Sequence, residues 1–415
     1  MLSSLGFHTM TLDLSLLRND VKTLLLDFKT YSETIPLKIY RKKEKEYVLY
    51  TLSEDYLPSD FKIYFDGKYK GIHWHIYSDE RYLNMVYIIE ATINPKILAG
   101  ITDYLTAATY GDMNIAIINF SDISKKISSL LGTFYDYKIK RIDYCINICL
   151  SDFIPTYDPE QTINLIKRSD IPPHYKEWME YDKTSHRMKS KPESFYLCSK
   201  SVNINYYSKY LQLQNRSEEN VENGYDPIPQ EIIDASHDII RFEVQCKYLK
   251  TYVLNKKAEN SGNKCPNKYK SLLTPLRCIE IVSSYYEKVI GKGDWYTLQE
   301  AVRKIKSKNF NSQKEKRLIN ALQYVSQCRS LAKAKAPLHD YELDAFKRTL
   351  KELSGFNINP VTIPKEWGIE HIPNLLCSYF NRLIEEAYRS GLPGADICTA
   401  HGYAEYVEKY GRSPI

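Results

Sequence analysis

The chain has 415 residues, of which 43% are hydrophobic and 26% charged, and its formal net charge is +6. This composition predicts a folded protein with at least one large core, allows two or three domains, and argues against a chain that is disordered throughout. No apolar run reaches about 18 residues, and residues 1–10 lack a basic segment followed by an apolar stretch. We therefore expect neither a membrane-spanning helix nor a secretory signal.

The first part of the chain is dominated by short segments rich in β-branched and aromatic residues. These segments predict strands at 8–14, 37–40, 47–52, 61–65, 72–77 and 85–93. A helix is expected over 16–28. A second, amphipathic helix is expected over 120–134, with Ser121 as its N-cap.

The middle of the chain continues the mixed pattern, and the end is helical. Further strands are expected at 137–150, 194–198, 202–211 and 239–248, a helix at 159–168 and a polar loop at 214–229. Helical periodicity predicts helices at 268–289, 297–305, 313–331, 340–353 and 372–390. The predicted fold class is α+β: antiparallel sheets with packed helices over 1–260, followed by a mainly helical domain over 261–415. Our hypothesis is that the first domain contains two related strand–helix–strand halves.

Nine cysteines occur, without a CxxC pair or a paired metal-ligand spacing. An odd number of cysteines in a chain without a signal is typical of reduced thiols in a cytoplasm, and a cysteine-based zinc site is disfavoured. The sequence also contains no P-loop and no GxGxxG in a phosphate-binding context, so a motor ATPase or a dinucleotide enzyme has no support.

Two of the expected strands carry charged side chains on one face. Because side chains alternate along a strand, Arg141, Asp143, Cys145 and Asn147 share a face, as do Arg241, Glu243, Gln245 and Lys247. If the two strands belong to one sheet, Asp143 and Glu243 could converge on a hard cation such as Mg²⁺. The alternative is a solvent-exposed face with cross-strand ion pairs.

Two further motifs could carry chemistry. Tyr207 and Lys209 lie two residues apart on an expected strand, and a tyrosine hydroxyl becomes a nucleophile where a cation favours the phenolate. The same spacing recurs at Tyr181 in an expected loop, so spacing alone does not identify a nucleophile. His73 and His75 flank Trp74 and could hold a divalent metal, the alternative being a chance pair on an exposed strand.

The positive charge is concentrated in one block. From 301 to 336 the chain has ten Lys or Arg and one acid. Such a block is typical of a surface that contacts a phosphate backbone, the alternative being a solvated helix face. The candidate DNA-binding residues of this block are Arg303, Lys304, Lys306, Lys308, Lys314, Lys316 and Arg317.

Four segments, taken in order, form a further pattern. They are an acid followed by Pro-Lys-x-Leu-x-Gly at 89–100, Arg-Ile-Asp at 140–143, Tyr-x-Lys within 204–214, and Arg-Phe-Glu followed by Tyr-Leu-Lys within 240–250. In this order and spacing they resemble the gene II/X replication initiators of filamentous phages and related plasmids. Members of that family are nickase-ligases for rolling-circle DNA replication.

The resemblance implies roles for individual residues. Tyr207 matches the family's nucleophile and Lys209 its companion, while Glu90, Asp143 and Glu243 match the acids of the other segments. We infer that these three acids hold Mg²⁺ or Mn²⁺. His73 and His75 do not belong to the family's motif, and Asn147 stands where related replication proteins often have a second acid.

The implied activity is that of a replication initiator in the cytoplasm of a bacterial host cell. It would nick and rejoin one strand of origin DNA through a 5′-phosphotyrosyl link, leaving a 3′-OH that primes a host polymerase. Arg141 and Arg241 could clamp flanking phosphates or form ion pairs with their own neighbouring acids. The implied partners are double-stranded and locally single-stranded origin DNA, a host helicase and a single-strand-binding protein, with no membrane. The alternatives are a plasmid initiator or conjugative relaxase of the related class, and a non-catalytic origin-binding protein.

Overall fold

The computed structural model describes residues 4–33, 37–43, 45–51, 57–65, 71–83, 85–101, 105–153, 158–182, 186–222, 226–260 and 271–390. Residue 52 of an expected strand, Lys183 beside Tyr181, and residues 261–270, where the second expected domain begins, lie outside these ranges. Among the described helices, none is long and apolar enough to cross a membrane.

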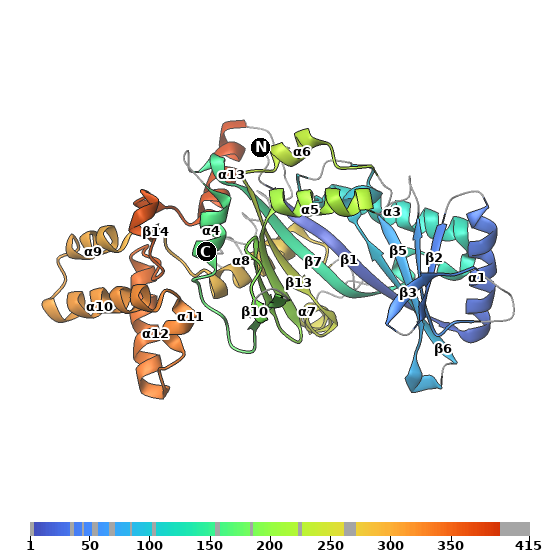
Figure 1. Cartoon of the computed structure of the whole chain (residues 1–415), viewed down its shortest axis with the longest axis horizontal. Coiled ribbons are helices and arrows are strands. Elements are labelled where there is room, and N and C mark those ends of the chain that lie inside the picture. Colours follow the sequence, from blue (N-terminus) through green and yellow to red (C-terminus); the bar gives the residue numbers. More distant parts are fainter. Residues whose placement is uncertain are drawn as a thin grey trace.

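One antiparallel sheet of 11 strands forms the centre of the molecule, in the order β3-β2-β4-β5-β6-β1-β7-β13-β12-β11-β8. This sheet and its helices confirm the α+β prediction (Figure 1). Its strands are β1 (Ser4–Leu17), β2 (Leu37–Lys43), β3 (Glu46–Leu49), β4 (Asp60–Phe65), β5 (Ile72–Ser78), β6 (Val86–Ile93), β7 (Lys138–Cys149), β8 (Lys176–Glu177), β11 (Ser194–Cys198), β12 (Val202–Ser208) and β13 (Ile239–Cys246). Two short pairs lie outside it: β9 (Glu180–Asp182) with β10 (Arg187–Lys189), and β14 (Trp295–Tyr296) with β15 (His371–Ile372).

Helices connect and cover the strands. They are α1 (Arg18–Ser32), α2 (Pro95–Leu98), α3 (Tyr110–Ile127), α4 (Pro159–Ile166), α5 (Lys209–Glu222), α6 (Gln230–Ala235), α7 (Tyr248–Asn260), α8 (Pro275–Val289), α9 (Leu298–Lys306), α10 (Ser312–Cys328), α11 (Leu331–Lys335), α12 (Asp340–Gly355) and α13 (Leu375–Ser390). Short 3-10 helices span Glu80–Tyr82, Ser129–Leu131, Phe134–Asp136, Leu150–Asp152 and Lys365–Trp367.

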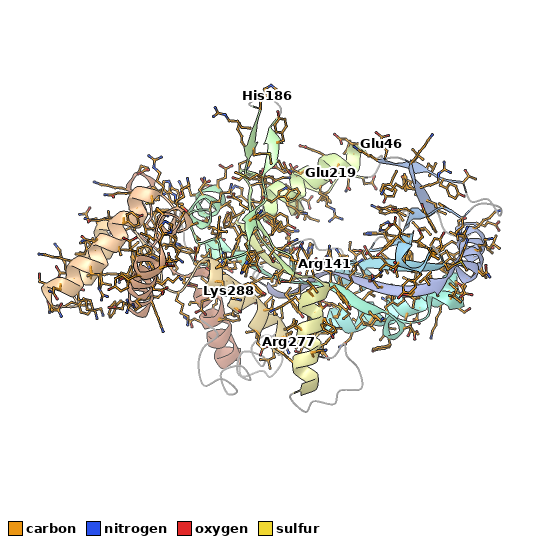
Figure 2. The ribbon with its side chains drawn as sticks, turned by 90° about the horizontal axis from the view of Figure 1, so that it is seen from below. Glu46, Arg141, His186, Glu219, Arg277 and Lys288 are labelled. Atoms are coloured by element: carbon orange, nitrogen blue, oxygen red, sulfur yellow. The ribbon has the colours of Figure 1, made fainter. Side chains whose placement is uncertain are left out.

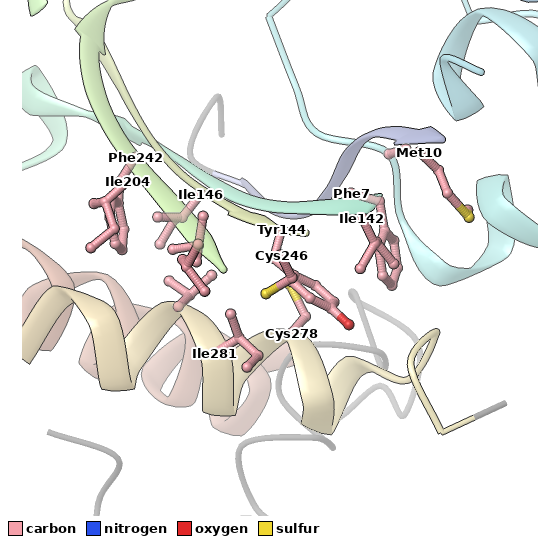
Figure 3. Close-up of a cluster of buried hydrophobic side chains, with 14 of the residues drawn as sticks. Phe7, Met10, Ile142, Tyr144, Ile146, Ile204, Phe242, Cys246, Cys278 and Ile281 are labelled. Atoms are coloured by element: carbon pink, nitrogen blue, oxygen red, sulfur yellow. The ribbon is translucent and has the colours of Figure 1, made fainter. Parts of the chain in front are cut away.

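The apolar face of the sheet is buried under α1, α3 and α8. The alternation expected for β7 and β13 holds, because Ile142, Tyr144 and Phe242 are fully buried on this face. Figure 3 shows these side chains above α8, where they pack with Cys278 and Ile281. Burial of such a continuous apolar surface is the main driving force for the fold.

The opposite face of the sheet is polar and is partly covered by α5. Figure 2 shows Glu219 of α5 and Glu46 of β3 on one side of the sheet, and Arg277 and Lys288 of α8 on the other. Arg141 of β7 lies between these two groups. The polar residues that alternate with the core residues of β7 and β13 therefore lie on the side of the sheet that carries α5.

The C-terminal region is mostly helical, as expected. Helix α8 shares the core of the sheet, whereas α9, α10 and α12 bury a second, smaller cluster that includes Ile305, Leu322 and Leu353. Figure 1 shows α9 and α10 at one end of the molecule and α1 at the other, with β7 and β13 between them. The division at residue 260 remains a proposal.

Two expected elements are wrong. The helix expected over 120–134 with a Ser121 cap runs instead over Tyr110–Ile127, because Thr109 and Asp112 form a capping box. Ser121 lies inside that helix and its hydroxyl donates to the carbonyl of Ile117 at 2.8 Å. Phe134 begins a separate 3-10 turn.

The segment after β12 also differs from its prediction. The strand expected over 202–211 ends at Ser208, and helix α5 occupies most of the loop expected over 214–229. Leu213 is the only apolar residue of α5 that is fully buried, so the helix has a very narrow apolar stripe. A stripe this narrow gives little periodicity in the sequence, and packing on the sheet decides the conformation.

Candidate active site

The two strands with charged faces are neighbours in the sheet. In the β7–β13 register, Glu243 stands opposite Cys145 and Gln245 opposite Asp143. Both carboxylates are almost completely buried, at 1% exposure for Asp143 and 3% for Glu243. The structure therefore brings together two of the three acids that the sequence singles out, and it does so in a solvent-shielded position.

His8 of β1 is the third member of this group. One ligand atom from each of His8, Asp143 and Glu243 lies within 4.8 Å of the others, so the group could hold a metal ion. His8 Nδ1 is 2.7 Å from Glu243 Oε2. An imidazole and two carboxylates form a donor set that suits a divalent cation.

A β-bulge puts His8 into the group. The pairing of β1 with β7 shifts between Phe7 and Met10, which are both buried in the core. The two residues between them, His8 and Thr9, therefore both face the polar side. The Thr9 hydroxyl donates to Asp143 while His8 contacts Glu243.

The buried atoms of the group fit a cation. His8 Nδ1 and Asp143 Oδ1 are shielded from solvent and have no hydrogen bond of good geometry among the described residues. Each nevertheless lies close to a polar atom, at 2.7 Å from Glu243 Oε2 and 3.1 Å from Arg141 Nε respectively. Buried polar atoms that lack a well-aligned partner favour a ligand at this point.

The protonation of these groups also favours metal binding. Burial lowers the pKa of His8, and the attraction of Glu243 offsets this only in part, so the environment favours the neutral imidazole. Burial disfavours the charged form of Glu243, but His8, Gln245 and Arg241 outweigh it and lower its pKa. Burial, together with Glu243, raises the pKa of Asp143. A neutral imidazole is the form that coordinates metal, and a cation would favour the ionised form of Asp143.

Tyr207 lies beside this group. It stands on β12 opposite Arg241 of β13, and its hydroxyl is 3.4 Å from Glu243 Oε2. Tyr206, by contrast, faces the core and stacks on Phe242 with ring centroids 4.4 Å apart. Burial raises the pKa of Tyr207, and Arg241 opposes that rise. Of the two adjacent tyrosines, only Tyr207 is placed to act with the three ligand candidates.

Arg241 is held by Asn147 and is completely buried. Its Nε donates to Asn147 Oδ1 at 2.6 Å, and the Asn147 amide group donates to the carbonyl of Leu105. An amide can accept from Arg241 and donate to Leu105 at once, which a carboxylate at this position could not do. Asn147 therefore positions Arg241 and is outside the ligand group.

The loop that contains Leu105 is held close to β1 by a glycine. Phe7 and Ala108 form a β-bridge with paired backbone hydrogen bonds. A Cβ atom at Gly6 would lie 2.0 Å from the Ala108 carbonyl oxygen. Only a glycine at position 6, two residues before His8, lets the backbone of β1 come this close to the backbone of Ala108.

Lys209 and Arg141 flank the group on either side. Lys209 is the first residue of α5, is 4% exposed, and donates to Gln212 Oε1 at 2.8 Å. Burial lowers the pKa of Lys209, and Arg241 lowers it further. Arg141 donates to Thr9 Oγ1 at 3.0 Å and pairs with Asp143, so it adopts the ion pair that was one of its two expected alternatives.

Glu90 lies in a different cluster. It forms an ion pair with Lys140, whose ammonium is also 3.7 Å from Asp13 Oδ1. The structure thus does not bring Glu90 to Asp143 and Glu243. Its carboxylate pairs with Lys140, and the residue opposite it on β5 is His75.

The two histidines of the His73-Trp74-His75 motif are on β5 and lie outside the His8 group. His75 Nε2 is 2.8 Å from Asp60 Oδ1, and His73 stacks on Tyr64 with ring centroids 5.3 Å apart. Burial lowers the pKa of His73 to about 4. These two contacts are with residues of β4, and the His75 ring also lies 4.8 Å from the ring of Tyr77 on its own strand, centroid to centroid.

The basic block forms α9, α10 and α11, away from the His8 group (Figure 1). Some of its cations are paired, because Arg303 contacts Glu300 at 2.7 Å, and Lys314 and Arg317 contact Glu352 at 3.5 Å and 2.7 Å. Lys304 lies over the ring of Tyr296. Exposed cations of the block without an ion pair to a described residue are Lys306, Lys308, Lys316, Arg329 and Lys333.

No protein-family model and no curated protein matches this chain. Among solved structures it is similar to a rolling circle replication initiator protein from Geobacillus stearothermophilus. The identity is 10%, the TM-score is 0.31, and the similarity covers 88% of this chain and 99% of that chain. A similarity of this degree is too low to support a statement about this chain.

Sequence reasoning missed His8. The alternation of β1 changes phase at the bulge, so no regular pattern marks His8 and Thr9 as neighbours on the polar face. Gln245, which donates to Glu243 Oε1 at 2.7 Å, was on the predicted face but had no assigned role. The signal that could have pointed to His8 is a histidine two residues after a glycine in a strand, which is too common to be informative alone.

Proposed function

We propose that this protein is a DNA strand transferase that nicks and rejoins one strand of origin DNA in rolling-circle replication. The observation that carries this proposal is the Tyr207 hydroxyl, 3.4 Å from Glu243, beside a buried group that could hold a metal. The order of the four sequence motifs resembles that of rolling-circle replication initiators, and this resemblance indicates that the substrate is origin DNA. The two lines of support are independent, because one is geometric and the other comes from residue order.

The proposed covalent step is a transesterification in which Tyr207 is the nucleophile. The Tyr207 oxygen forms a bond to the scissile phosphorus, the bond from phosphorus to the 3′-oxygen breaks, and that oxygen takes up a proton. One phosphodiester is exchanged for another, so the same 3′-hydroxyl can later attack the phosphotyrosine and restore the strand. No external energy source is needed for rejoining.

The residues around Tyr207 would prepare this step. Arg241 stands opposite Tyr207 in the sheet and presents a permanent positive charge that favours the phenolate and the developing negative charge on the phosphate. Thr9 and Arg141 orient Asp143, while Gln245 orients Glu243. A divalent cation such as Mg²⁺ or Mn²⁺, held by His8, Asp143 and Glu243, would polarise the phosphate and lower the pKa of Tyr207.

The basic block on α9 and α10 is the proposed contact for duplex phosphates. Exposed lysines there could follow a phosphate backbone without reading bases. Strand separation would then require a separate helicase, and the released strand a single-strand-binding protein. Host helicase, polymerase and single-strand-binding protein therefore remain proposed partners.

The test is a cleavage assay on supercoiled origin DNA with Mn²⁺ or EDTA, followed by mass-spectrometric mapping of the protein–DNA adduct. We expect a metal-dependent adduct on Tyr207, lost in Tyr207→Phe with DNA binding preserved within a few fold. Tyr181→Phe is the matched control, because it has the same Tyr-x-Lys spacing but an exposed side chain. An adduct on Tyr181, or DNA binding without any adduct, would contradict the proposal, and the latter result would favour a non-catalytic origin-binding protein.

A further inference from the structure

A cleft of about 700 Å³ opens on the polar side of the sheet next to the His8 group. Its walls come from β1, β2, β4, β5 and β6 on one side and from α5 on the other. His8 and Thr9 form part of the lining, and these residues also contact Glu243 and Asp143. The cleft is therefore continuous with the candidate active site and lies within the size range of ligand-binding cavities.

Aromatic rings form one wall of the cleft. Tyr64 stacks on His73 with an interplanar angle of 22°, and Tyr40 meets Tyr64 edge to face with centroids 5.8 Å apart. All three rings come from neighbouring strands, so they form a continuous platform. The stacked pair covers one face of each of its two rings, so another planar group would stack on the partly exposed outer surface of this row of rings.

The charge of the cleft is of one sign. Its described lining includes Lys38, Lys62 and Arg216 and contains no carboxylate. Burial also lowers the pKa of His73 to about 4, so this ring is neutral and available for stacking. Amide side chains of Asn94, Gln212 and Asn220 add hydrogen-bonding groups.

Stacking surfaces combined with cations and amides recognise single-stranded nucleic acid. Each base has a flat face that can stack on an aromatic ring, and each phosphate can be met by a cation. In a duplex the faces of the bases are already covered by their neighbours, so such a platform can serve only unstacked bases. The basic helices α9 and α10, with the turn between them, expose lysines at Lys306, Lys308 and Lys316.

We propose that this cleft binds the unpaired nucleotides next to the phosphate that Tyr207 attacks. This inference rests on the proposed function and states where the DNA substrate of that function would bind. The bases would stack on Tyr40, Tyr64 and His73, and the phosphates would pass Arg216 and Lys62 toward His8. The cleft thus selects DNA that is already open, which restricts the covalent step to the melted part of an origin.

The binding test uses the full-length protein in EDTA, so that cleavage does not interfere. The probes are a fluorescein-labelled single-stranded oligonucleotide of origin sequence and the matching duplex, measured by fluorescence anisotropy over a salt series. In Tyr64→Leu and Arg216→Gln we expect about tenfold weaker binding to the single strand and duplex binding within about twofold. Arg216→Gln is also expected to reduce the salt dependence by about 0.7 in slope, as for one phosphate contact.

Matched controls separate a local effect from misfolding. Tyr82→Leu removes a tyrosine that is 58% exposed outside the cleft, and Lys22→Gln removes an exposed cation on α1, which covers the opposite face of the sheet. Both are expected to bind single strands as the wild type does. Equal losses in the cleft variants and these controls, with unchanged far-UV circular dichroism, would overturn the proposal.

A crosslinking experiment supplies an independent result. An oligonucleotide with 5-iodouracil near the scissile position is irradiated, and the crosslinked residue is mapped by mass spectrometry. Crosslinks to Tyr40, Tyr64 or His73 support the cleft, whereas crosslinks confined to α9 and α10 overturn it. Binding of a free nucleotide as tight as that of the oligonucleotide would also overturn it, in favour of a small-molecule site.

The proposal and the proposed function fail in different ways. If the cleft is correct but the nickase is not, the single strand crosslinks to the cleft and no Tyr207 adduct forms with Mn²⁺. If the nickase is correct but the cleft is not, the adduct forms on Tyr207 and Tyr64→Leu cleaves single strands at subsaturating concentration as efficiently as the wild type does.

Discussion

Two clusters on the polar face of the sheet each contain two carboxylates, and they differ in the third side chain. In one, Asp143 and Glu243 meet His8. In the other, Asp13 and Glu90 stand opposite each other on β1 and β6 and meet Lys140. The ammonium of Lys140 compensates one of the two negative charges of its cluster, whereas the imidazole of His8 can add a ligand atom. Two nearby acids therefore do not define a metal site until the third group is known.

The carboxylates of the His8 cluster are also more deeply buried than those of the Lys140 cluster. Asp143 and Glu243 are 1% and 3% exposed, while the side chains of Asp13 and Glu90 retain 26% and 22%. In the first cluster little water reaches the charges, and Arg141 and Arg241 compensate them instead. In the second, water and Lys140 share that task, which suits a structural role between β1, β6 and β7.

The largest expected difference is in strand cleavage. Glu243→Gln removes a candidate ligand next to Tyr207, and we expect nicking of supercoiled origin DNA with Mn²⁺ to fall about 10³-fold, as for loss of a group that stabilises transition-state charge. Glu90→Gln is the matched control and is expected to stay within about threefold of the wild type. Equal losses in the two variants would show that the clusters do not differ in function.

The second-largest effect is expected in the affinity for a metal ion. We expect the wild type to bind one Mn²⁺ and His8→Ala to bind it at least about tenfold more weakly, measured by isothermal titration calorimetry. His75→Gln serves as control, because His75 contacts Asp60 and lies outside the group. If His75→Gln loses affinity and His8→Ala does not, the metal site belongs to β5.

Removing the lysine would change the second cluster into a cation site. Lys140→Met leaves Asp13 and Glu90 facing each other without compensation, and we expect the free energy of unfolding to fall by about 1–2 kcal/mol because the pair is partly solvated. Mg²⁺ in the millimolar range is expected to restore part of this loss in Lys140→Met and to have no such effect in a Lys140→Met, Glu90→Gln double variant. Urea denaturation with and without Mg²⁺ measures both.

The smallest effect concerns pH. Burial raises the pKa of Asp13 to about 6, although Lys140 lowers it, so the folded state binds the Asp13 proton more tightly than the unfolded state does. The resulting stabilisation is complete below pH about 4 and is lost as the pH rises through 6. Relative to wild type, Asp13→Asn should therefore gain about 1 kcal/mol of stability between pH 4 and pH 7, once partial exposure is taken into account. A stability difference that is constant over this range would show that Asp13 titrates normally.

Much of the fold was predictable from local patterns. The strands at 61–65, 72–77, 194–198 and 239–248 are found within a few residues of their expected limits, because alternation of apolar and polar residues is a local property. Tyr206 and Tyr207 were correctly placed on opposite faces for the same reason. The N-terminus of α3 was missed, because Thr109 and Asp112 specify it more strongly than the apolar spacing that begins later.

The sequence by itself determined which side chains share a face on each strand, and therefore that Asp143 and Glu243 are candidates for one site. Only the tertiary structure decided that β7 and β13 are neighbours, that a bulge in β1 adds His8, and that Lys140 draws Glu90 into a different cluster. Alternation along a strand follows from backbone geometry and can be recognised in consecutive residues of the sequence. Strand order, bulges and cross-strand partners depend on contacts between residues 50 to 134 positions apart, which no local pattern encodes.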